Sequence, residues 1–456
     1  MKPSGRGGAA PWAVAWALAV AGVVGCDGST DGPDTFRADT VTFFDVAPDS
    51  APDSAPAPDS APDSAAAPAP DSAPAPDSAP DSASDSAPAP DSASDSAPDA
   101  APDSAPDSAS DTGPDLASAL PAALQAQLQT AVDDHFAAVE APGVQVTVVV
   151  PGMGRWSEDA GLASADPPVP LAPGDRFRIG SITKTFNTAA VLQLVSEGVL
   201  ALGDPADKWL AGFDFGAGVT IERLLAHTSG LFNYTDDANF LGMSTEPATP
   251  AEVIAWARSH GQVFEPGAGW SYSNTGFYVT GLILEAASGD AFAQVVRERL
   301  SDPLGLSDTF LEDFEPMPGG RVTGHGLGSS LEGLLDMSWA WAAGGMVSNG
   351  DDLCRWAEAL YRGDVLTAPM REALITPASL PGGEKAGYGL GTYLAARGGV
   401  SVVGHTGSTM GFRGELFMHL ASGTCVAVLT NDFFASPREV SDAVWQTLAA
   451  QVPLTL

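Results

Sequence analysis

Residues 178–186 read RIGSITKTF, and this stretch decides how the rest of the chain is interpreted. Ser181 and Lys184 stand three positions apart, so on a helix they share one face. A serine hydroxyl becomes a good nucleophile when a neighbouring base takes its proton, and a lysine in a dry cleft can serve as that base. The same pattern equally fits an ordinary helix start with a solvated lysine one turn later. The interpretation therefore depends on what stands elsewhere in the chain.

A second motif lies about 90 residues downstream, in GWSYSNTG at 269–276. A tyrosine such as Tyr272 can share the proton transfer when a cation lies beside it. Asn274 has an amide that can hydrogen-bond both Lys184 and a substrate amide. Taken alone, the pair also fits a surface turn.

A third motif, VVGHTGSTMG at 402–411, follows an apparent strand. Gly407 lets a ligand approach the backbone closely. The N–H of Ser408 suits an oxyanion hole, as does the N–H of a serine at a helix start. Alone, this motif fits a strand end with a histidine beside it.

Ser-x-x-Lys, Tyr-x-Asn and His-Thr-Gly in this order resemble the serine β-lactamase and penicillin-binding protein superfamily. The chain looks most like the branch that contains class C β-lactamases, serine D-alanyl-D-alanine carboxypeptidases and related esterases. Further stretches carry the resemblance over about 120–450: LLAHTSGL at 224–231, PGAGWSYSNTG at 266–276, PLGL at 303–306 and AAGGMVSNGDDLCRWAEAL at 342–360. It implies an acyl-enzyme reaction without a metal or organic cofactor.

The resemblance also implies a role for each motif residue. These are Ser181 as acylated nucleophile, Lys184 as general base or proton relay, Tyr272 as second acid/base group that activates water, Asn274 as substrate-amide contact, His405, Thr406 and Gly407 as the strand along the substrate, and the N–H groups of Ser181 and Ser408 as oxyanion hole.

His405 departs from many β-lactamases, which carry lysine at this place. Histidine is only partly protonated at neutral pH, so we expect a substrate carboxylate to be held less firmly. Arg413 is a candidate for the missing charge and equally a surface salt-bridge residue. Branch members with histidine here include peptidases and esterases, so strong β-lactamase activity is in doubt.

Other residues fit simpler roles. We expect Glu265 to be a loop residue rather than a deacylating carboxylate, and His227 to be structural. Trp270 and Trp341 flank Gly-rich motifs, so we expect them near the cleft. The remaining histidines show no metal-ligand spacing.

The pattern of elements predicts an α+β fold, an α/β sandwich like that of β-lactamases. A helix over 117–143 precedes a β-branched strand, VQVTVVV, and a helix follows Ser181 up to Gly198. About 200–370 is helical with Gly/Pro-rich loops, and three strands and a helix end the chain. We expect one antiparallel sheet flanked by the terminal helices, with a large α-helical lobe.

The N-terminus predicts export. Lys2 and Arg6 precede an apolar run over 11–24, which is short for a spanning helix and typical of a secretory signal. It ends in Val-Val-Gly-Cys26, which resembles a bacterial lipobox with Cys26 as the lipidated residue. We therefore expect a periplasmic or cell-surface lipoprotein. A plain signal peptide and a buried apolar segment are the alternatives. Asp27 resembles an inner-membrane retention signal in some bacteria, and the choice of membrane stays open.

Residues 27–117 form a predicted linker before a hydrolase domain at 118–456. From about 46 to 116 it repeats APDS-like units of Pro, Ala, Ser and Asp without Lys or Arg, so it cannot bury a core and is predicted to be disordered. Fully extended it reaches on the order of 200 Å, which suits a stalk. An unselected low-complexity expansion would look the same.

Charge and cysteines narrow the function classes. The formal net charge of −37 argues against nucleic acid and against docking on an anionic membrane surface. Cys354 and Cys425 are either a disulfide or simply buried. We therefore expect a monomeric, lipid-anchored serine hydrolase that acts on a small-molecule or peptide amide or ester of the D-Ala-D-Ala or β-lactam type. The alternatives are an esterase or transacylase with little β-lactam activity, and a non-catalytic surface-displayed binding protein.

Overall fold

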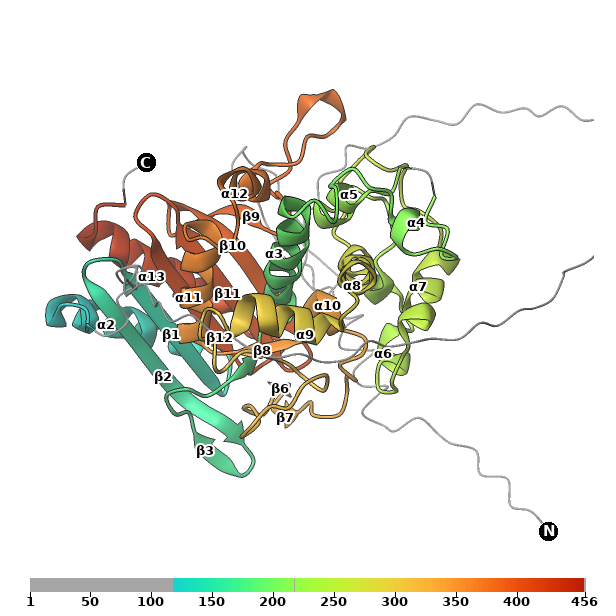
Figure 1. Cartoon of the computed structure of the whole chain (residues 1–456). Helices are drawn as coiled ribbons and strands as arrows, with labels where there is room; N and C mark the ends of the chain where they lie inside the picture. Colours follow the sequence, from blue (N-terminus) through green and yellow to red (C-terminus); the bar gives the residue numbers. More distant parts are fainter. Residues whose placement is uncertain (1–117, 217, 455–456) are drawn as a thin grey trace, which may run out of the picture. The chain divides into compact units, whose positions relative to one another are not determined.

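The computed structural model describes residues 118–216 and 218–454 (Figure 1). The predicted signal sequence, Cys26 and the linker at 27–117 lie outside these residues.

A large antiparallel sheet organises the described part of the chain. Its strands lie in the order β3 (Pro168–Pro170), β2 (Gly154–Ala165), β1 (Gly143–Val150), β12 (Thr424–Thr430), β11 (Phe412–His419), β10 (Val400–Thr409) and β9 (Tyr393–Arg397). The central strands β1 and β12 are buried on both faces, which explains their nearly unbroken runs of apolar and β-branched residues. Val144 pairs with Thr430 and Val149 with Cys425, so the two ends of the described chain meet at the centre of the sheet.

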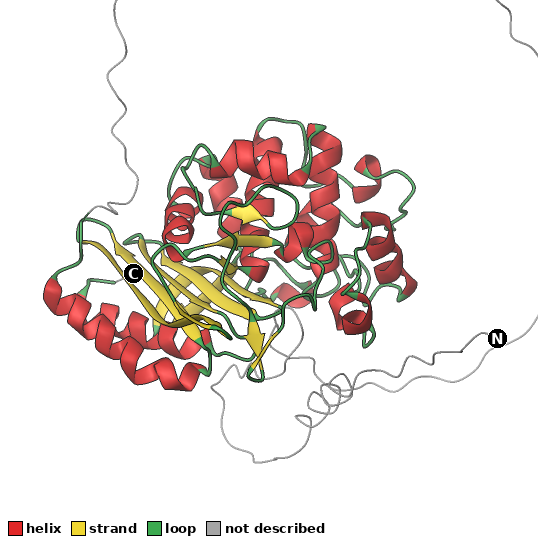
Figure 2. Cartoon of the chain, turned by 90° about the horizontal axis from the view of Figure 1, so that it is seen from below, coloured by secondary structure: helices red, strands yellow, loops and turns green. Residues whose placement is uncertain are grey.

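Two helices cover one face of this sheet, α2 (Ala122–Val139) and α13 (Pro437–Gln451), as Figure 2 shows. Their apolar residues, including Leu128, Val132 and Trp445, form one core with Val146 and Val428 of the sheet. Each fully buried side chain of this size contributes roughly 1.5–3 kcal/mol. The packing explains why two helices at opposite ends of the sequence lie together.

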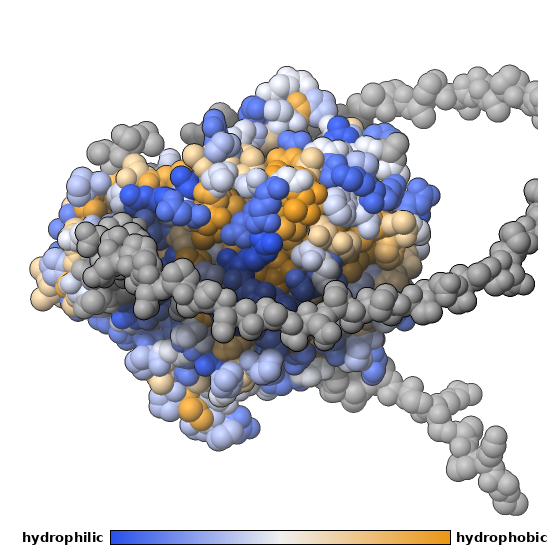
Figure 3. Space-filling model, viewed as in Figure 1, coloured by the Kyte–Doolittle hydropathy of each residue, from blue (hydrophilic) through white to orange (hydrophobic). Residues whose placement is uncertain are grey.

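Helices of a second group lie on the other side of the sheet (Figures 1 and 2). Helix α11 (Gly350–Tyr361) packs on β1, β11 and β12. The others are α3 (Thr183–Ser196), α4 (Ala206–Trp209), α5 (Ile221–Leu225), α6 (Phe240–Met243), α7 (Pro250–Ser259), α8 (Asn274–Ser288), α9 (Phe292–Val296), α10 (Trp341–Gly344) and α12 (Ala368–Ile375). On the face in Figure 3, apolar surface gathers near the middle of the view within a mostly hydrophilic surround.

Short elements connect these layers. They are the sheet β4 (Phe177–Arg178), β8 (Met346–Ser348) and β5 (Phe310–Leu311), the hairpin β6 (His325–Gly326) and β7 (Ser329–Ser330), the 3-10 turns η1 (Gly180–Ile182), η2 (Tyr234–Asp236) and η4 (Pro381–Gly383), and the π-helical turn η3 (Arg297–Ser301).

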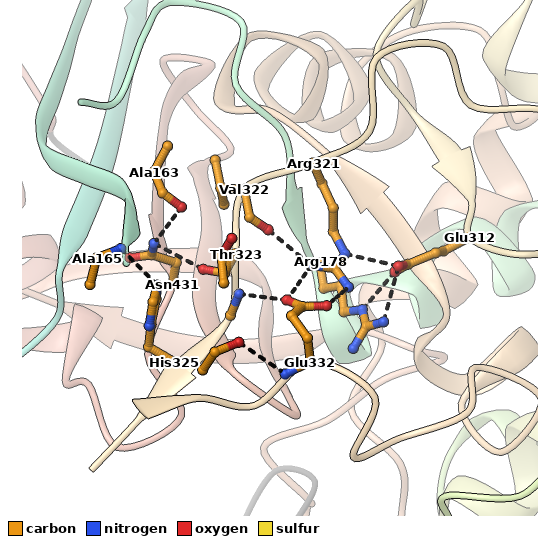
Figure 4. Close-up of polar contacts among 12 residues, drawn as sticks. Ala163, Ala165, Arg178, Glu312, Arg321, Val322, Thr323, His325, Glu332 and Asn431 are labelled. Carbon is orange, nitrogen blue, oxygen red and sulfur yellow. Dashed lines mark hydrogen bonds and ion pairs between the residues drawn. The ribbon is translucent and has the colours of Figure 1, made fainter. Parts of the chain in front are cut away.

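A buried ion network anchors β4, the strand that leads into Ser181 (Figure 4). Arg178 donates to both carboxylate oxygens of Glu312 at 2.6 and 3.0 Å. Arg321 joins Glu312 at 2.8 Å and forms a bidentate pair with Glu332. Burial raises the pKa of Glu332, but the Arg321 guanidinium more than offsets this and holds that pKa at about 2. The network ties β4 to the segment 312–332.

Asn431, also in Figure 4, fastens the end of β12. Its side-chain oxygen accepts from the Gly143 N–H at 2.8 Å, and its NH₂ donates to the carbonyls of Leu162 and Thr323 at 3.0 and 3.1 Å. One side-chain amide therefore hydrogen-bonds to the backbone of three separate segments, which a smaller or apolar side chain cannot do.

The α+β prediction is confirmed by this arrangement. Cys354 and Cys425 are buried free cysteines, as the second of the two alternatives expected. Within the described ranges no single helix has the length and hydropathy to cross a membrane; α8 joined to Phe292–Ser301 reaches both only as a pair, which is bent by 80°.

Candidate active site

Ser181 lies in the turn η1, just before α3 begins at Thr183. Gly180 precedes it with φ +51°, and a Cβ there would lie 2.6 Å from the Ser408 nitrogen. The turn therefore needs glycine for its backbone conformation and for its contact with β10. Ser181 is fully buried, so its hydroxyl is shielded from bulk water.

Lys184 points at Ser181 from the first turn of α3. Its Nζ donates to Ser181 Oγ at 2.6 Å, to Asn274 Oδ1 at 2.7 Å and to the Ala343 carbonyl at 2.7 Å. The side chain is fully buried, and these three acceptors are neutral. The predicted nucleophile and base are thus in direct contact.

Asn274 begins α8 and is held from two sides. Its backbone N–H donates to Asn233 Oδ1 at 3.0 Å, and its side-chain NH₂ donates to Thr235 Oγ1 at 3.1 Å. Because the NH₂ points to Thr235, the side-chain oxygen faces Lys184. The expected contact between Asn274 and Lys184 is present.

Tyr272 lies in the loop before α8 and is only 5% exposed. The Lys184 ammonium lies 4.9 Å from the centroid of its ring. The ring also lies 6.4 Å from that of His405 and 4.2 Å from that of His227. The predicted acid/base tyrosine therefore belongs to the same buried group as Lys184.

His405 is fully buried on β10, and both of its ring nitrogens have partners. Nδ1 lies 2.5 Å from the Thr406 carbonyl and Nε2 lies 2.8 Å from the Tyr388 hydroxyl. A carbonyl only accepts, so the ring proton sits on Nδ1 and Nε2 accepts from Tyr388. Burial, and secondly the charge on Lys184, lower the pKa of His405 to about 3. The expectation of a partly protonated histidine is wrong, because His405 is neutral throughout the physiological range.

The remaining motif residues bring β10 against the nucleophile turn. A Cβ on Gly407 would lie 1.9 Å from the Ile179 carbonyl oxygen, so only glycine permits this approach. The same contact holds the Ser408 backbone beside Gly180 and close to Ser181. Thr406 is half-buried, and its carbonyl accepts from His405. A substrate oxygen between the N–H groups of Ser181 and Ser408 would meet two backbone donors.

Several other expectations have clear outcomes. Glu265 is exposed in a loop, as expected, and Trp270 stands 5.7 Å from the ring of His227 at the edge of the site. Trp341 does not line the site: it is buried against Tyr278 and Phe292, with ring centroids at 4.9 and 5.5 Å. The sequence interpretation placed it there only because of its glycine neighbours.

Arg413 lies on β11 at a half-buried position. It pairs with Ser408 across β10 and β11, and its guanidinium lies 5.7 Å from the centroid of the Phe433 ring. Burial raises the pKa of Asp432, and the charge of Arg413 partly offsets this rise, so neither of the two expected roles of Arg413 is decided.

Sequence reasoning missed several partners of the motif residues, among them Tyr388, Thr235 and the carbonyl of Ala343. Tyr388 had a signal, since it stands in the glycine-rich run GYGLG at 387–391. The other two act through a hydroxyl or the backbone and carry no pattern of their own. In the described ranges no group of three or more His, Cys, Asp or Glu is placed to hold a metal ion.

Comparison with known proteins places this geometry in context. The Beta-lactamase family model matches residues 128–451. Penicillin-binding protein 4* of Bacillus subtilis (strain 168) is 28% identical over 283 residues, which is 58% of this chain and 62% of that protein. The chain spans about three-fifths of the length of the curated relatives it matches.

Solved structures match over a larger share. A D-stereospecific amidohydrolase from Streptomyces sp. is 30% identical with a TM-score of 0.61, covering 73% of this chain and 99% of that one. The D-amino acid amidase from Ochrobactrum anthropi SV3, complexed with D-phenylalanine, is 26% identical with a TM-score of 0.65, covering 72% and 99%.

Proposed function

The chain belongs to the Beta-lactamase family, whose members among its relatives are serine hydrolases, and from that premise we propose that Ser181 is acylated by an amide or ester. The carrying observation is the 2.6 Å contact between Lys184 Nζ and Ser181 Oγ inside a buried site. Asn274 and the Ala343 carbonyl hold Lys184 Nζ from two sides, so that its third contact is with the Ser181 hydroxyl. A purely structural role for Lys184 does not explain this third contact. This arrangement also disfavours the non-catalytic binding protein.

The proposed reaction has two halves. In the resting site Lys184 donates three hydrogen bonds as an ammonium, so it must first give up one proton to solvent. In the first half, the neutral amine then takes the Ser181 proton while Oγ attacks the carbonyl carbon, and the N–H groups of Ser181 and Ser408 stabilise the oxyanion. The proton passes to the leaving group, directly or through Tyr272. In the second, Tyr272 activates a water that attacks the ester carbonyl and releases Ser181.

We propose that the preferred substrates carry no carboxylate beside β10. A β-lactam or a D-Ala-D-Ala peptide presents such a carboxylate, and His405 is neutral and engaged with Tyr388. The relatives named for D-amino acid amide and D-stereospecific amide hydrolysis support a D-configured amide or ester instead. This departs from the expected D-Ala-D-Ala or β-lactam type of substrate and is nearer to the alternative of an esterase or transacylase with little β-lactam activity.

A substrate panel on the full chain tests both statements. D-phenylalanine amide, its L-enantiomer, p-nitrophenyl butyrate and nitrocefin would be compared, with Ser181→Ala as control. We expect turnover of the D-amide or the ester well above that of nitrocefin, and none above background for Ser181→Ala. Equal covalent labelling of parent and Ser181→Ala by a fluorophosphonate would refute the nucleophile, and nitrocefin as the best substrate would refute the substrate class.

We further propose export as a lipoprotein anchored through Cys26, with 27–117 as a stalk. The lipobox-like sequence and the Pro/Ala/Asp/Ser-rich composition support this. Expression of the parent and of Cys26→Ala in a bacterial host, followed by membrane fractionation and mass spectrometry, tests it. The parent should be in the membrane fraction with added acyl mass, and recovery of unmodified parent in the soluble fraction would contradict the anchor. A monomeric state stays a prediction.

A further inference from the structure

His227 accepts hydrogen bonds from both residues that flank Tyr272 in the sequence. The carbonyl of His227 accepts from the Ser271 N–H at 3.0 Å, and its ring Nδ1 accepts from the Ser273 N–H at 3.1 Å. The two chain neighbours of Tyr272 are therefore tied to one residue of a distant segment. The backbone that carries the tyrosine has little freedom left at this point.

The ring of His227 also supports the ring of Tyr272. Their centroids are 4.2 Å apart with the planes tilted by 37°. Phe277 and Tyr388 lie against His227 at 5.3 and 4.7 Å, and the histidine is 1% exposed. Because His227 is itself fixed by packing, it limits the rotation of Tyr272.

The backbone of His227 adopts a conformation that histidine does not favour. Its φ is +58°, in the left-handed region, where a residue with a Cβ costs on the order of 1 kcal/mol or more. Glycine would relieve this cost but would supply neither the ring nor Nδ1. The strain is therefore the cost of placing an imidazole beside Tyr272.

The imidazole is also a poor choice for packing alone. Since Nδ1 accepts from a backbone N–H, the ring proton is on Nε2, and this buried atom has no hydrogen-bond partner among the described residues. An unsatisfied buried donor costs about 1–3 kcal/mol. Burial, then the charge of Lys184, lower the pKa of His227 well below its usual value, so the ring adds no charge beside the lysine. An apolar ring would fill this space without the penalty, but could not accept from Ser273.

We propose that His227 is a positioning residue that holds Tyr272 in place for proton transfer with Lys184 and Ser181. The expectation that His227 is only structural is thereby replaced by a role in the reaction. The proposal rests on the proposed acyl-enzyme reaction, in which Tyr272 moves protons.

Three substitutions in the full chain separate positioning from packing. His227→Ala removes the ring and the acceptor, His227→Phe keeps a ring without the acceptor, and His227→Asn keeps an acceptor and tolerates positive φ. His419→Asn is the matched control. That histidine is 4% exposed, its Nδ1 accepts from the Ser422 N–H at 3.3 Å, and it lies at the end of β11 away from Ser408.

The readout is kcat and KM per active site, with active sites counted by fluorophosphonate labelling and folding followed by thermal denaturation. We expect kcat to fall roughly 10²-fold in His227→Ala and His227→Phe, since a misplacement of about 1 Å costs this much. The kcat of His227→Asn should be at least about tenfold higher than that of His227→Ala. KM should change less than about threefold, and His419→Asn should lose stability without losing kcat per active site.

Two outcomes would overturn this proposal and leave the proposed function standing, and a third would overturn both. Parent-like kcat per active site in His227→Ala, whatever its melting temperature, would show a structural role only. Full recovery by His227→Phe would assign the effect to packing instead of the Ser273 hydrogen bond. A parent enzyme that labels no better than Ser181→Ala would refute the proposed function itself, and this inference with it.

Discussion

Gly407→Ala is the change that best tests whether β10 and the nucleophile turn form one unit. Gly407 has no unusual φ, so alanine fits its backbone conformation and the effect is steric. The added Cβ would lie 1.9 Å from the Ile179 oxygen, whereas ordinary contact begins at 3.4 Å. The turn and the strand must therefore separate by about 1.5 Å.

The cost of this separation can be worked out from the surroundings. Strand β10 is paired with β9 on one edge and with β11 on the other, so it cannot retreat easily. The displacement is then taken by the turn, and Ser181 moves away from the Ser408 N–H. A shift of about 1 Å costs roughly 10²-fold, so we expect acylation to slow by at least that factor. Overpacking should lower stability by about 1–3 kcal/mol.

The assay is the acylation rate constant from pre-steady-state kinetics with a p-nitrophenyl ester, alongside urea unfolding. Gly203→Ala is the control, because a Cβ there meets nothing within 4 Å. It should leave both quantities nearly unchanged. If Gly407→Ala acylated at the parent rate with parent stability, the close approach of β10 to Ile179 and the oxyanion role of Ser408 would both be refuted.

Three further predictions concern charge. Arg178→Ala should destabilise the protein by about 3 kcal/mol in urea unfolding, at the low end for a broken buried pair because Glu312 keeps Arg321; an effect below about 1 kcal/mol would contradict the network. Because the pKa of Glu332 is held at about 2, its contribution to the free energy of unfolding should be complete above pH about 4.3 and lost as pH falls toward 2. In thermal denaturation, the melting temperature of Glu332→Gln should fall less steeply with decreasing pH than that of the parent. Identical slopes of melting temperature against pH would contradict the low pKa of Glu332. With the pKa of His405 at about 3, the pH profile of kcat/KM should show no titration of this histidine between pH 5 and 8. His405→Gln should therefore lower kcat/KM without changing the shape of the profile. A fall of kcat/KM below pH about 6.5 in the parent that is absent from His405→Gln would show that His405 titrates.

The motifs that the sequence revealed are those in which residue type and spacing both carry chemistry. Ser181 and Lys184 are one helical turn apart, so their contact follows from local geometry. Tyr272 and Asn274 were recognised from a short pattern and from resemblance, and their approach to Lys184 depends on the whole lobe. The neutrality of His405 was not predictable, because it comes from burial and from Tyr388, which have no local signature.

The fold shows the same division. The strands β1, β10, β11 and β12 were expected from their apolar and β-branched runs. Strand β2 was not, because GRWSEDAGLASA is rich in polar and small residues and is only partly buried. Strand β2 is held in place by antiparallel backbone pairing with β1, and this pairing leaves no pattern in the side chains of β2.

The pairing of β1 with β12 has a consequence for how the protein is made. Val144 and Thr430 belong to adjacent central strands but are separated by most of the domain sequence. The central ladder of the sheet cannot form until the chain has been synthesised past Thr430, and contacts of such long range slow folding. The sheet therefore closes late, and the exposed apolar faces of β1 and β2 must wait for β11 and β12 before they are covered.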